Sequence, residues 1–280
     1  MKFGARALPA IPKDNTDRNR TSPFAFTGNK FEFRMLGSTL SISDPNTVLN
    51  TIVADVLAEF ADRLEATDDF VNEVNTIIKE TYREHKRIIF NGDGYSAAWE
   101  LEAKERGLLN LRSTVDAVVH WIDTKNIELF ERHKVLNRVE LQCRLDIALE
   151  NYCKTIHIEA LTLIDMVSKN IIPAISRYIN DLSVCVVNKK AAFGEIDCEV
   201  EQKIIAKLNT YLKEIYTLVR KLEKSVAAAD SMHGLEEAKA YNRSVNALMG
   251  ELRKPIDAAE LITAKDYWPF PDYSDLLFTI

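Results

Sequence analysis

The sequence has few residues that interrupt helices: 9 Gly and 8 Pro in 280 residues, with most of the prolines near the two ends. Long helices are therefore expected in the middle of the chain. The four cysteines include no CxxC pair, which favours reduced, partly buried thiols over a disulfide framework or a zinc site. No apolar run reaches the ~18 residues that span a membrane, and the first residues lack the apolar core of a signal peptide. We expect a cytoplasmic protein that does not enter a membrane.

Composition and charge narrow the class of protein further. With 46% hydrophobic and 28% charged residues, the chain can bury a sizeable core and is neither disordered nor of low complexity. Residues 1–40 carry seven basic and three acidic side chains, a net charge of +4, so the rest of the chain stands at −10. A basic N-terminal segment followed by an acidic remainder indicates that an anionic ligand binds near residues 1–40. Nucleic acid is disfavoured as a partner, because the positive charge is not clustered along a helix.

The front of the chain differs in pattern from the rest. Residues 1–45 read as loop and short strand, because prolines and glycines interrupt any helix there. Within them, residues 29–35 alternate with a period of two, which predicts a strand. Lys30, Glu32 and Arg34 share one face of that strand, and three apolar side chains occupy the other.

Helical spacing of apolar residues begins directly after this region. Asp44 as N-cap and Pro45 at the first helical position predict the start of a first helix. Ser96 is expected to cap a short helix that Gly107 ends. The helices predicted in this part of the chain cover residues 46–64, 68–89, 96–106, 113–124 and 127–133.

From residue 138 onward the pattern predicts a helical bundle. Pro173 should kink or restart the first long helix. Residues 199–229 form a second long helix with a seam spaced alternately by four and three, as in bundles. Further helices are expected over 235–252 and, opened by Pro255, over 255–264. The tail that follows is rich in aromatic residues, which are unfavourable when exposed to solvent. We therefore expect the tail to dock on another domain or subunit.

The polar face of the front strand is the best candidate site. A carboxylate between two cations makes sense if all three face a polar ligand: Glu32 could hold Mg²⁺, which prefers oxygen ligands. Arg34 could grip a carboxylate with its bidentate fork, and Lys30 could neutralise phosphate. Taken by themselves, these residues fit a cross-strand ladder of ion pairs somewhat better than a ligand site.

A family resemblance changes this balance. The stretch TDRNRTSPFAFTGNKFEFR, residues 16–34, resembles the loop and strand of glutamine synthetases, in particular those of the type III branch. The resemblance continues through PNTVLNTIVADVLAEFADRL, RIIFNGDGYS and GLLNLRSTVDAV to the terminal WPFPDYSDLLF, so it covers essentially the whole chain. The first stretch is highly specific, and the later ones agree in their order.

The resemblance implies a role for each matching position. Arg20 would contact the phosphates of ATP and stabilise charge during phosphoryl transfer, with Lys30 on the nucleotide side. Glu32 would bind an active-site Mg²⁺ or Mn²⁺, and Arg34 would hold the carboxylate of the substrate glutamate. The implied reaction joins glutamate and ammonia through a γ-glutamyl phosphate, in a homo-oligomeric enzyme.

The match departs from the family pattern in two places. Many members carry a second arginine five residues after the loop arginine, where this chain has Ala25, and Arg18 is a candidate to replace it. The acidic residue that helps to deprotonate ammonium has only weak candidates, Asp14 and Asp17. The family's further metal ligands are expected upstream of these positions, so we expect the chain alone to be incomplete as a catalyst.

The predicted fold is mainly α. A short N-terminal loop and β-strand segment, a piece of a glutamine synthetase catalytic sheet, precedes long helices that form a helical bundle. Residues 1–130 would be the C-terminal remnant of the catalytic domain, and residues 131–280 a C-terminal helical bundle with an aromatic docking tail. The alternative functions are a non-catalytic helical bundle for assembly or regulation and, less favoured, a stand-alone helical adaptor.

Overall fold

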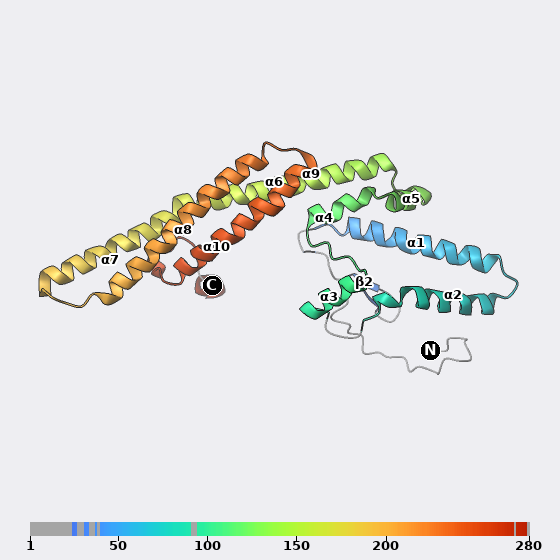
Figure 1. Ribbon diagram of the computed structural model, residues 1–280, viewed down its shortest axis with the longest axis horizontal. Helices are drawn as coiled ribbons and strands as arrows, with labels where there is room; N and C mark the ends of the chain where they lie inside the picture. The colour runs from blue at the N-terminus through green and yellow to red at the C-terminus, as the bar shows by residue number, and fades with distance from the viewer. Residues whose placement is uncertain are drawn as a thin grey trace. The chain divides into compact units, whose positions relative to one another are not determined.

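The fold is helical, as predicted, with one short β-hairpin near the front (Figure 1). The computed structural model describes residues 24–26, 31–33, 37, 40–90, 94–271 and 273–278. The chain divides into two compact units: unit 1 comprises residues 1–112 and 120–141, and unit 2 comprises residues 113–119 and 142–280. Within the described ranges, no helix is both long enough and apolar enough to cross a membrane.

Unit 1 is built on a helical hairpin of α1 and α2, which lie side by side. Its apolar centre lies where α1 meets α5: Ile127, Phe130 and Leu141 are buried there, and Val48 packs against them. The elements are β1 (Phe24–Phe26), β2 (Phe31–Phe33), α1 (Ser43–Glu65), α2 (Phe70–His85), η1 (Lys86–Ile88), α3 (Ala97–Glu105) and α5 (Thr124–Arg132).

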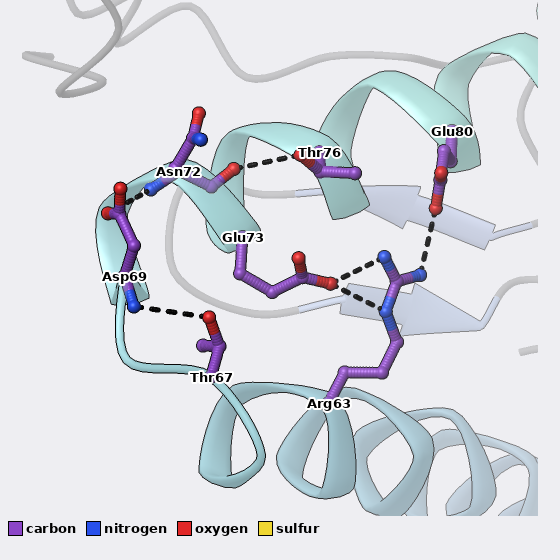
Figure 2. Close-up of polar contacts among 7 residues, drawn as sticks. All are labelled: Arg63, Thr67, Asp69, Asn72, Glu73, Thr76 and Glu80. Carbon is purple, nitrogen blue, oxygen red and sulfur yellow. Dashed lines mark hydrogen bonds and ion pairs between the residues drawn. The ribbon is translucent and has the colours of Figure 1, made fainter.

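Short polar side chains set where several of these helices begin. The Ser96 hydroxyl accepts a hydrogen bond from the Trp99 amide at 3.2 Å, which confirms the predicted cap of α3. The α2 cap is Asp69, one residue after the predicted start, and its carboxylate accepts from the Asn72 amide (Figure 2). The prediction for α1 was wrong, because Asp44 lies inside its first turn rather than at the cap. There Asp44 still opposes the positive end of the helix dipole.

Arg63 joins the two helices of the hairpin. Its guanidinium binds Glu73 at 2.6–2.8 Å and Glu80 at 2.9 Å, so one side chain of α1 holds two carboxylates about two turns apart on the same face of α2 (Figure 2). The hydrogen bonds that Arg63 donates to Glu73 and then to Glu80 raise the pKa of Arg63 above its ordinary value. Because Nε and Nη2 both contact Glu73 Oε1 while Nη1 binds Glu80, the guanidinium fixes the register of α1 against α2.

Asp55 makes the corresponding connection between α1 and α5. One carboxylate oxygen accepts from His133 Nε2 at 2.8 Å and from Arg132 Nη1 at 2.7 Å. The hydrogen bond from His133 and the charge of Arg132 lower the pKa of Asp55. The ionised form of Asp55 is therefore the one that holds α5 in place.

Unit 2 is a bundle whose central member is α8, which packs along both α7 and α10 (Figure 1). Its long helix α6 begins at the edge of unit 1, inside residues 138–141. The elements are α4 (Thr114–Val118), η2 (Val119–Ile122, at the boundary), α6 (Arg138–Met166), η3 (Val167–Ile171), α7 (Ile172–Phe193), α8 (Glu199–Ala229), α9 (Gly234–Ala240), η4 (Tyr241–Asn246), α10 (Ala247–Glu260), η5 (Lys265–Tyr267) and α11 (Tyr273–Phe278).

The observed bounds of α8 match the prediction, and so does its seam. Leu208, Ile215 and Leu222 have no solvent-exposed surface, and Val226 continues the stripe. The spacing of four and three keeps these side chains on the face that meets α7 and α10. The side chains of this stripe form the main apolar core of unit 2.

Pro173 restarts a helix, as predicted. It sits in the first turn of α7, directly after the π-helical turn η3. Proline has no amide hydrogen and its ring clashes with the carbonyl four residues earlier, so it disfavours a regular α-helical turn. The wider π turn accommodates the proline while Val167 and Ile171 stay buried.

The prediction for Pro255 was wrong. Pro255 does not open a new helix but lies inside α10, which continues to Glu260. Pro255 and Ile256 are buried, as are Leu252 and Ala259 one turn to either side. Packing of this apolar face against α8 therefore outweighs the lost backbone hydrogen bond of the proline.

A polar cluster around the buried Tyr241 connects α6, the end of α8 and η4. The Tyr241 side chain is 1% exposed, and its hydroxyl donates to the Asp230 carboxylate. His157 Nδ1 lies 2.8 Å from the Tyr241 oxygen and 3.1 Å from Asp230 Oδ1. Burial, followed by the bond to Asp230, raises the pKa of Tyr241. Since the tyrosine hydroxyl is satisfied in this way, it can lie in the core.

The α8 seam yields a stability prediction. Ile215→Ala should destabilise unit 2 by about 2–5 kcal/mol, because it removes a fully buried side chain and leaves a cavity. Ile158→Ala, at a helical position that is 63% exposed, should change stability by no more than about 0.5 kcal/mol. Urea unfolding followed by circular dichroism measures both, and equal losses for the two variants would contradict the assignment of the core.

The Asp55 connection predicts a pH dependence. Because the folded pKa of Asp55 is lowered, its contribution is fully present above the unfolded pKa and disappears as the pH falls through the folded value. Asp55→Asn should therefore lower the melting temperature of unit 1 at pH 7, and the difference from wild type should close in acid.

Thermal unfolding at pH 7 and at successively lower pH measures this difference. Asp62→Asn, at an exposed position on the same helix, is the matched control and should match wild type throughout. A deficit of Asp55→Asn that persisted unchanged to pH 2 would argue against a charge-dependent connection.

Candidate functional site

The β-hairpin carries one of the predicted site residues. β1 and β2 pair in antiparallel fashion, with Phe24 opposite Phe33, Ala25 opposite Glu32 and Phe26 opposite Phe31. The described part of the predicted strand over residues 29–35 is thus extended and paired. Glu32 occupies the central position of β2, where the backbone is fixed by pairing on one side.

The other predicted site residues cannot be placed in the same way. Arg20, Lys30 and Arg34 lie outside the described residues, as do the weaker candidates Arg18, Asp14 and Asp17. Their roles, and that of the Glu32 side chain, stay predictions. By residue number all four assigned positions fall within unit 1.

A clamp around Arg106 was not foreseen from the sequence. Phe90 and Trp99 stack with ring centroids 3.8 Å apart, and the Arg106 guanidinium lies 5.4 Å from the Trp99 ring centroid. The same side chain donates to the backbone carbonyls of Arg87 and Ile89 at 2.9–3.1 Å. The aromatic residues that flank the Gly- and Asn-rich turn were the available signal. The clamp fixes the segment that leads into this turn.

The hairpin of α1 and α2 carries an apolar pocket of about 330 Å³. Phe60 of α1 forms one wall, and Ile77 and Tyr82 of α2 form much of the rest, with Ile88 and Ile89 at the end. Tyr82 and Ile88 are largely exposed. The pocket has the character of a packing surface rather than of a site for a charged ligand, because it offers almost no polar groups.

The polar groups in the described ranges do not form a metal centre. Within those ranges no three His, Cys, Asp or Glu side chains are grouped closely enough to hold an ion. His120 and His133 each bind an aspartate instead, and His157 binds Tyr241.

Comparison with known proteins gives the family. A family model for the glutamine synthetase C-terminal domain matches residues 73–190, from the first turn of α2 nearly to the end of α7. This match includes the Arg106 clamp and crosses the boundary between the two units. The residues before position 73, which include the β-hairpin and α1, lie outside this match. Their similarity is seen in the comparison with whole proteins.

Three curated relatives extend the similarity to nearly the whole chain. A glutamine synthetase of Butyrivibrio fibrisolvens is 38% identical over 96% of the chain, and a type-3 glutamine synthetase of Dictyostelium discoideum is 39% identical over 99%. A glutamine synthetase of Bacteroides fragilis is 34% identical over 100%. The chain spans 39–40% of the length of these relatives. It therefore belongs to the glutamine synthetase family, in its type III branch, and corresponds to the C-terminal part of such proteins.

Proposed function

We propose that this chain supplies part of the active site of an ATP-dependent glutamate–ammonia ligase. ATP transfers its γ-phosphoryl group to the γ-carboxylate of glutamate, ADP leaves, and ammonia then displaces phosphate to give glutamine. The observation that carries the proposal is similarity to glutamine synthetases over 96–100% of the chain, including the hairpin with Glu32. Since the chain spans 39–40% of these relatives, the proposed activity belongs to the whole protein.

Each assigned residue meets a separate demand of this reaction. Glu32 contributes a carboxylate to Mg²⁺ or Mn²⁺, which neutralises charge on the phosphates when bound. Arg20 and Lys30 face the phosphates of ATP, and Arg34 orients glutamate by its carboxylate. Positioning and charge neutralisation dominate phosphoryl transfer, so a strand and loop lined with cations suit it.

The remainder of the chain has a structural part in the same proposal. The apolar pocket of the α1–α2 hairpin is a surface that the rest of the synthetase could cover. A homo-oligomer is the expected assembly. Unit 2 holds none of the four assigned positions, which suits a role in assembly. The four cysteines carry free thiols, and a cytoplasmic location remains part of the proposal.

A chimera provides the direct test of Glu32. The chain would replace the matching C-terminal part of the Butyrivibrio fibrisolvens synthetase, and glutamine formation would be measured with ATP and Mg²⁺. Glu32→Gln should reduce activity at least about a hundredfold, since loss of residues that merely support metal ligands already costs about 10–100-fold.

The matched control for this test is Glu59→Gln, an exposed position on α1, which should keep full activity. Circular dichroism should show unchanged helix content in both variants. A folded parent chimera that forms no glutamine would contradict the ligase proposal. Activity of Glu32→Gln equal to that of Glu59→Gln would contradict the metal role alone.

Arg34 is tested by the split between KM and kcat. Arg34→Lys keeps the charge but loses the bidentate fork, so the KM for glutamate should rise about tenfold or more, with a smaller change in kcat. Arg83→Lys, at an exposed position on α2, should leave both constants unchanged. An unaltered KM in the Arg34 variant would remove this residue from the glutamate site.

A further inference from the structure

The long helix α6 presents a stripe of exposed side chains in unit 2. Its inward face buries Leu145, Leu149 and Cys153. The outward stripe is spaced by three or four residues, the period of one helical face, and consists of Cys143, Ile147, Glu150, Lys154, Ile158 and Leu161. The three large apolar members are 47–63% exposed, and Cys143 is exposed as well. Apolar side chains that repeat along the outer face of a helix are the pattern that a second helix covers.

Two opposite charges stand at the centre of this stripe. Glu150 and Lys154 form an ion pair one turn apart, with 2.5 Å between Nζ and Oε1, and both side chains are exposed. Such a pair contributes little to the stability of one copy of the chain. Apolar side chains flank the pair on both sides, and Cys143 at one end acts as a small apolar residue. The stripe is therefore apolar at its two ends and charged in the middle.

The order of residues along the stripe is nearly the same when it is read backwards. Cys143 and Leu161 each lie nine residues from position 152, and Glu150 and Lys154 each lie two residues from it. The two isoleucines lie five and six residues away. A second α6 that runs antiparallel, with a two-fold axis at the level of residue 152, therefore brings apolar side chains together at both ends. It also brings Glu150 of each copy next to Lys154 of the other.

We infer that this stripe is an interface at which two copies of the chain pack antiparallel along α6. The charges decide the direction, because a parallel pair would place Glu150 beside Glu150 and Lys154 beside Lys154, and like charges in contact oppose association. A two-fold interface uses the same patch on both copies, which requires a self-complementary surface such as this one. The inference does not depend on the ligase proposal, and it names a surface for the expected homo-oligomer.

The size of the stripe sets the strength of association to expect. From Cys143 to Leu161 the stripe is about 27 Å long, and one pair of helices of that length makes a small interface. We therefore expect a dimer that forms at high protein concentration and dissociates on dilution. In the dissociated chain Ile158 faces solvent, so its truncation leaves the stability of unit 2 unchanged under dilute conditions.

Cys143 provides a native thiol for a cross-linking test. Leu161→Cys adds a thiol opposite Cys143 of the other copy, and packed helices are close enough for a disulfide between them. Mild oxidation should then give a covalent dimer on non-reducing gel electrophoresis. The half-buried Cys185 would be replaced by serine in all variants, whereas Cys153 and Cys198 are buried.

The matched control is Glu159→Cys, at an exposed position two residues earlier that points about 200° away around the helix. It should stay monomeric. The parent, which has Cys143 alone on this stripe, should stay monomeric too, because the two Cys143 thiols of an antiparallel pair lie about 27 Å apart. Equal cross-linking of Leu161→Cys and Glu159→Cys would overturn the inference, and so would a parent that cross-links as fully, the mark of a parallel pair. A folded Leu161→Cys variant that forms no covalent dimer would overturn it as well.

Exchange of the central charges gives a second test without cysteine chemistry. Glu150→Lys should weaken the dimer about tenfold, because both contacts with Lys154 of the other copy become repulsive. Glu150→Lys combined with Lys154→Glu should restore the wild-type dissociation constant, measured by sedimentation over about 10–200 μM. Circular dichroism should show unchanged helix content in both variants. A wild-type chain that is monomeric throughout this range, or a double variant that associates as weakly as the single one, would contradict the antiparallel pairing.

Discussion

Unit 2 depends on the burial of one stripe of side chains along α8. Leu208, Ile215 and Leu222 are completely removed from solvent, and the helices on either side, α7 and α10, share no comparable contact with any other element. Most helical stability in proteins comes from packing of an amphipathic helix's apolar face rather than from intrinsic propensity, and α8 presents such a face. The polar cluster at Tyr241 and the hydrogen bond from the Tyr267 hydroxyl to Asp181 of α7 both involve helices that this stripe holds in place.

The π turns between α6 and α7 and between α9 and α10 both contribute residues to the core of unit 2. Along the second of these pairs the buried residues Tyr241, Val245 and Met249 are four apart, whereas Leu252 follows after three. Tyr241 and Val245 lie within the π turn over residues 241–246 and are buried there. The π turn before Pro173 keeps Val167 and Ile171 buried in the same manner.

Much of the fold could be predicted from the sequence, because the regular spacing of apolar residues and the identity of capping residues are local signals. The bounds of α8, the cap at Ser96 and the restart at Pro173 follow from the residues themselves. Pro255 shows the limit: the local preference for a helix start lost to packing against α8, which is a property of the assembled bundle. The Arg106 clamp was missed for a similar reason, since it joins backbone carbonyls and rings that become neighbours only after folding.

The candidate site was predicted from a motif, and the hairpin register adds one physical argument to it. Ala25 stands at the position where many family members carry a second arginine, and it is the residue opposite Glu32. Residues directly opposite in an antiparallel pair have Cβ atoms about 4.5–5.5 Å apart, so an arginine there would be placed to pair with the glutamate. Alanine offers no such charge, so the proposed role of Glu32 as a metal ligand meets no competing ion pair from this position. Under the same proposal, the positive charge that the phosphates require would come from Arg20 and Lys30, with Arg18 as a further candidate.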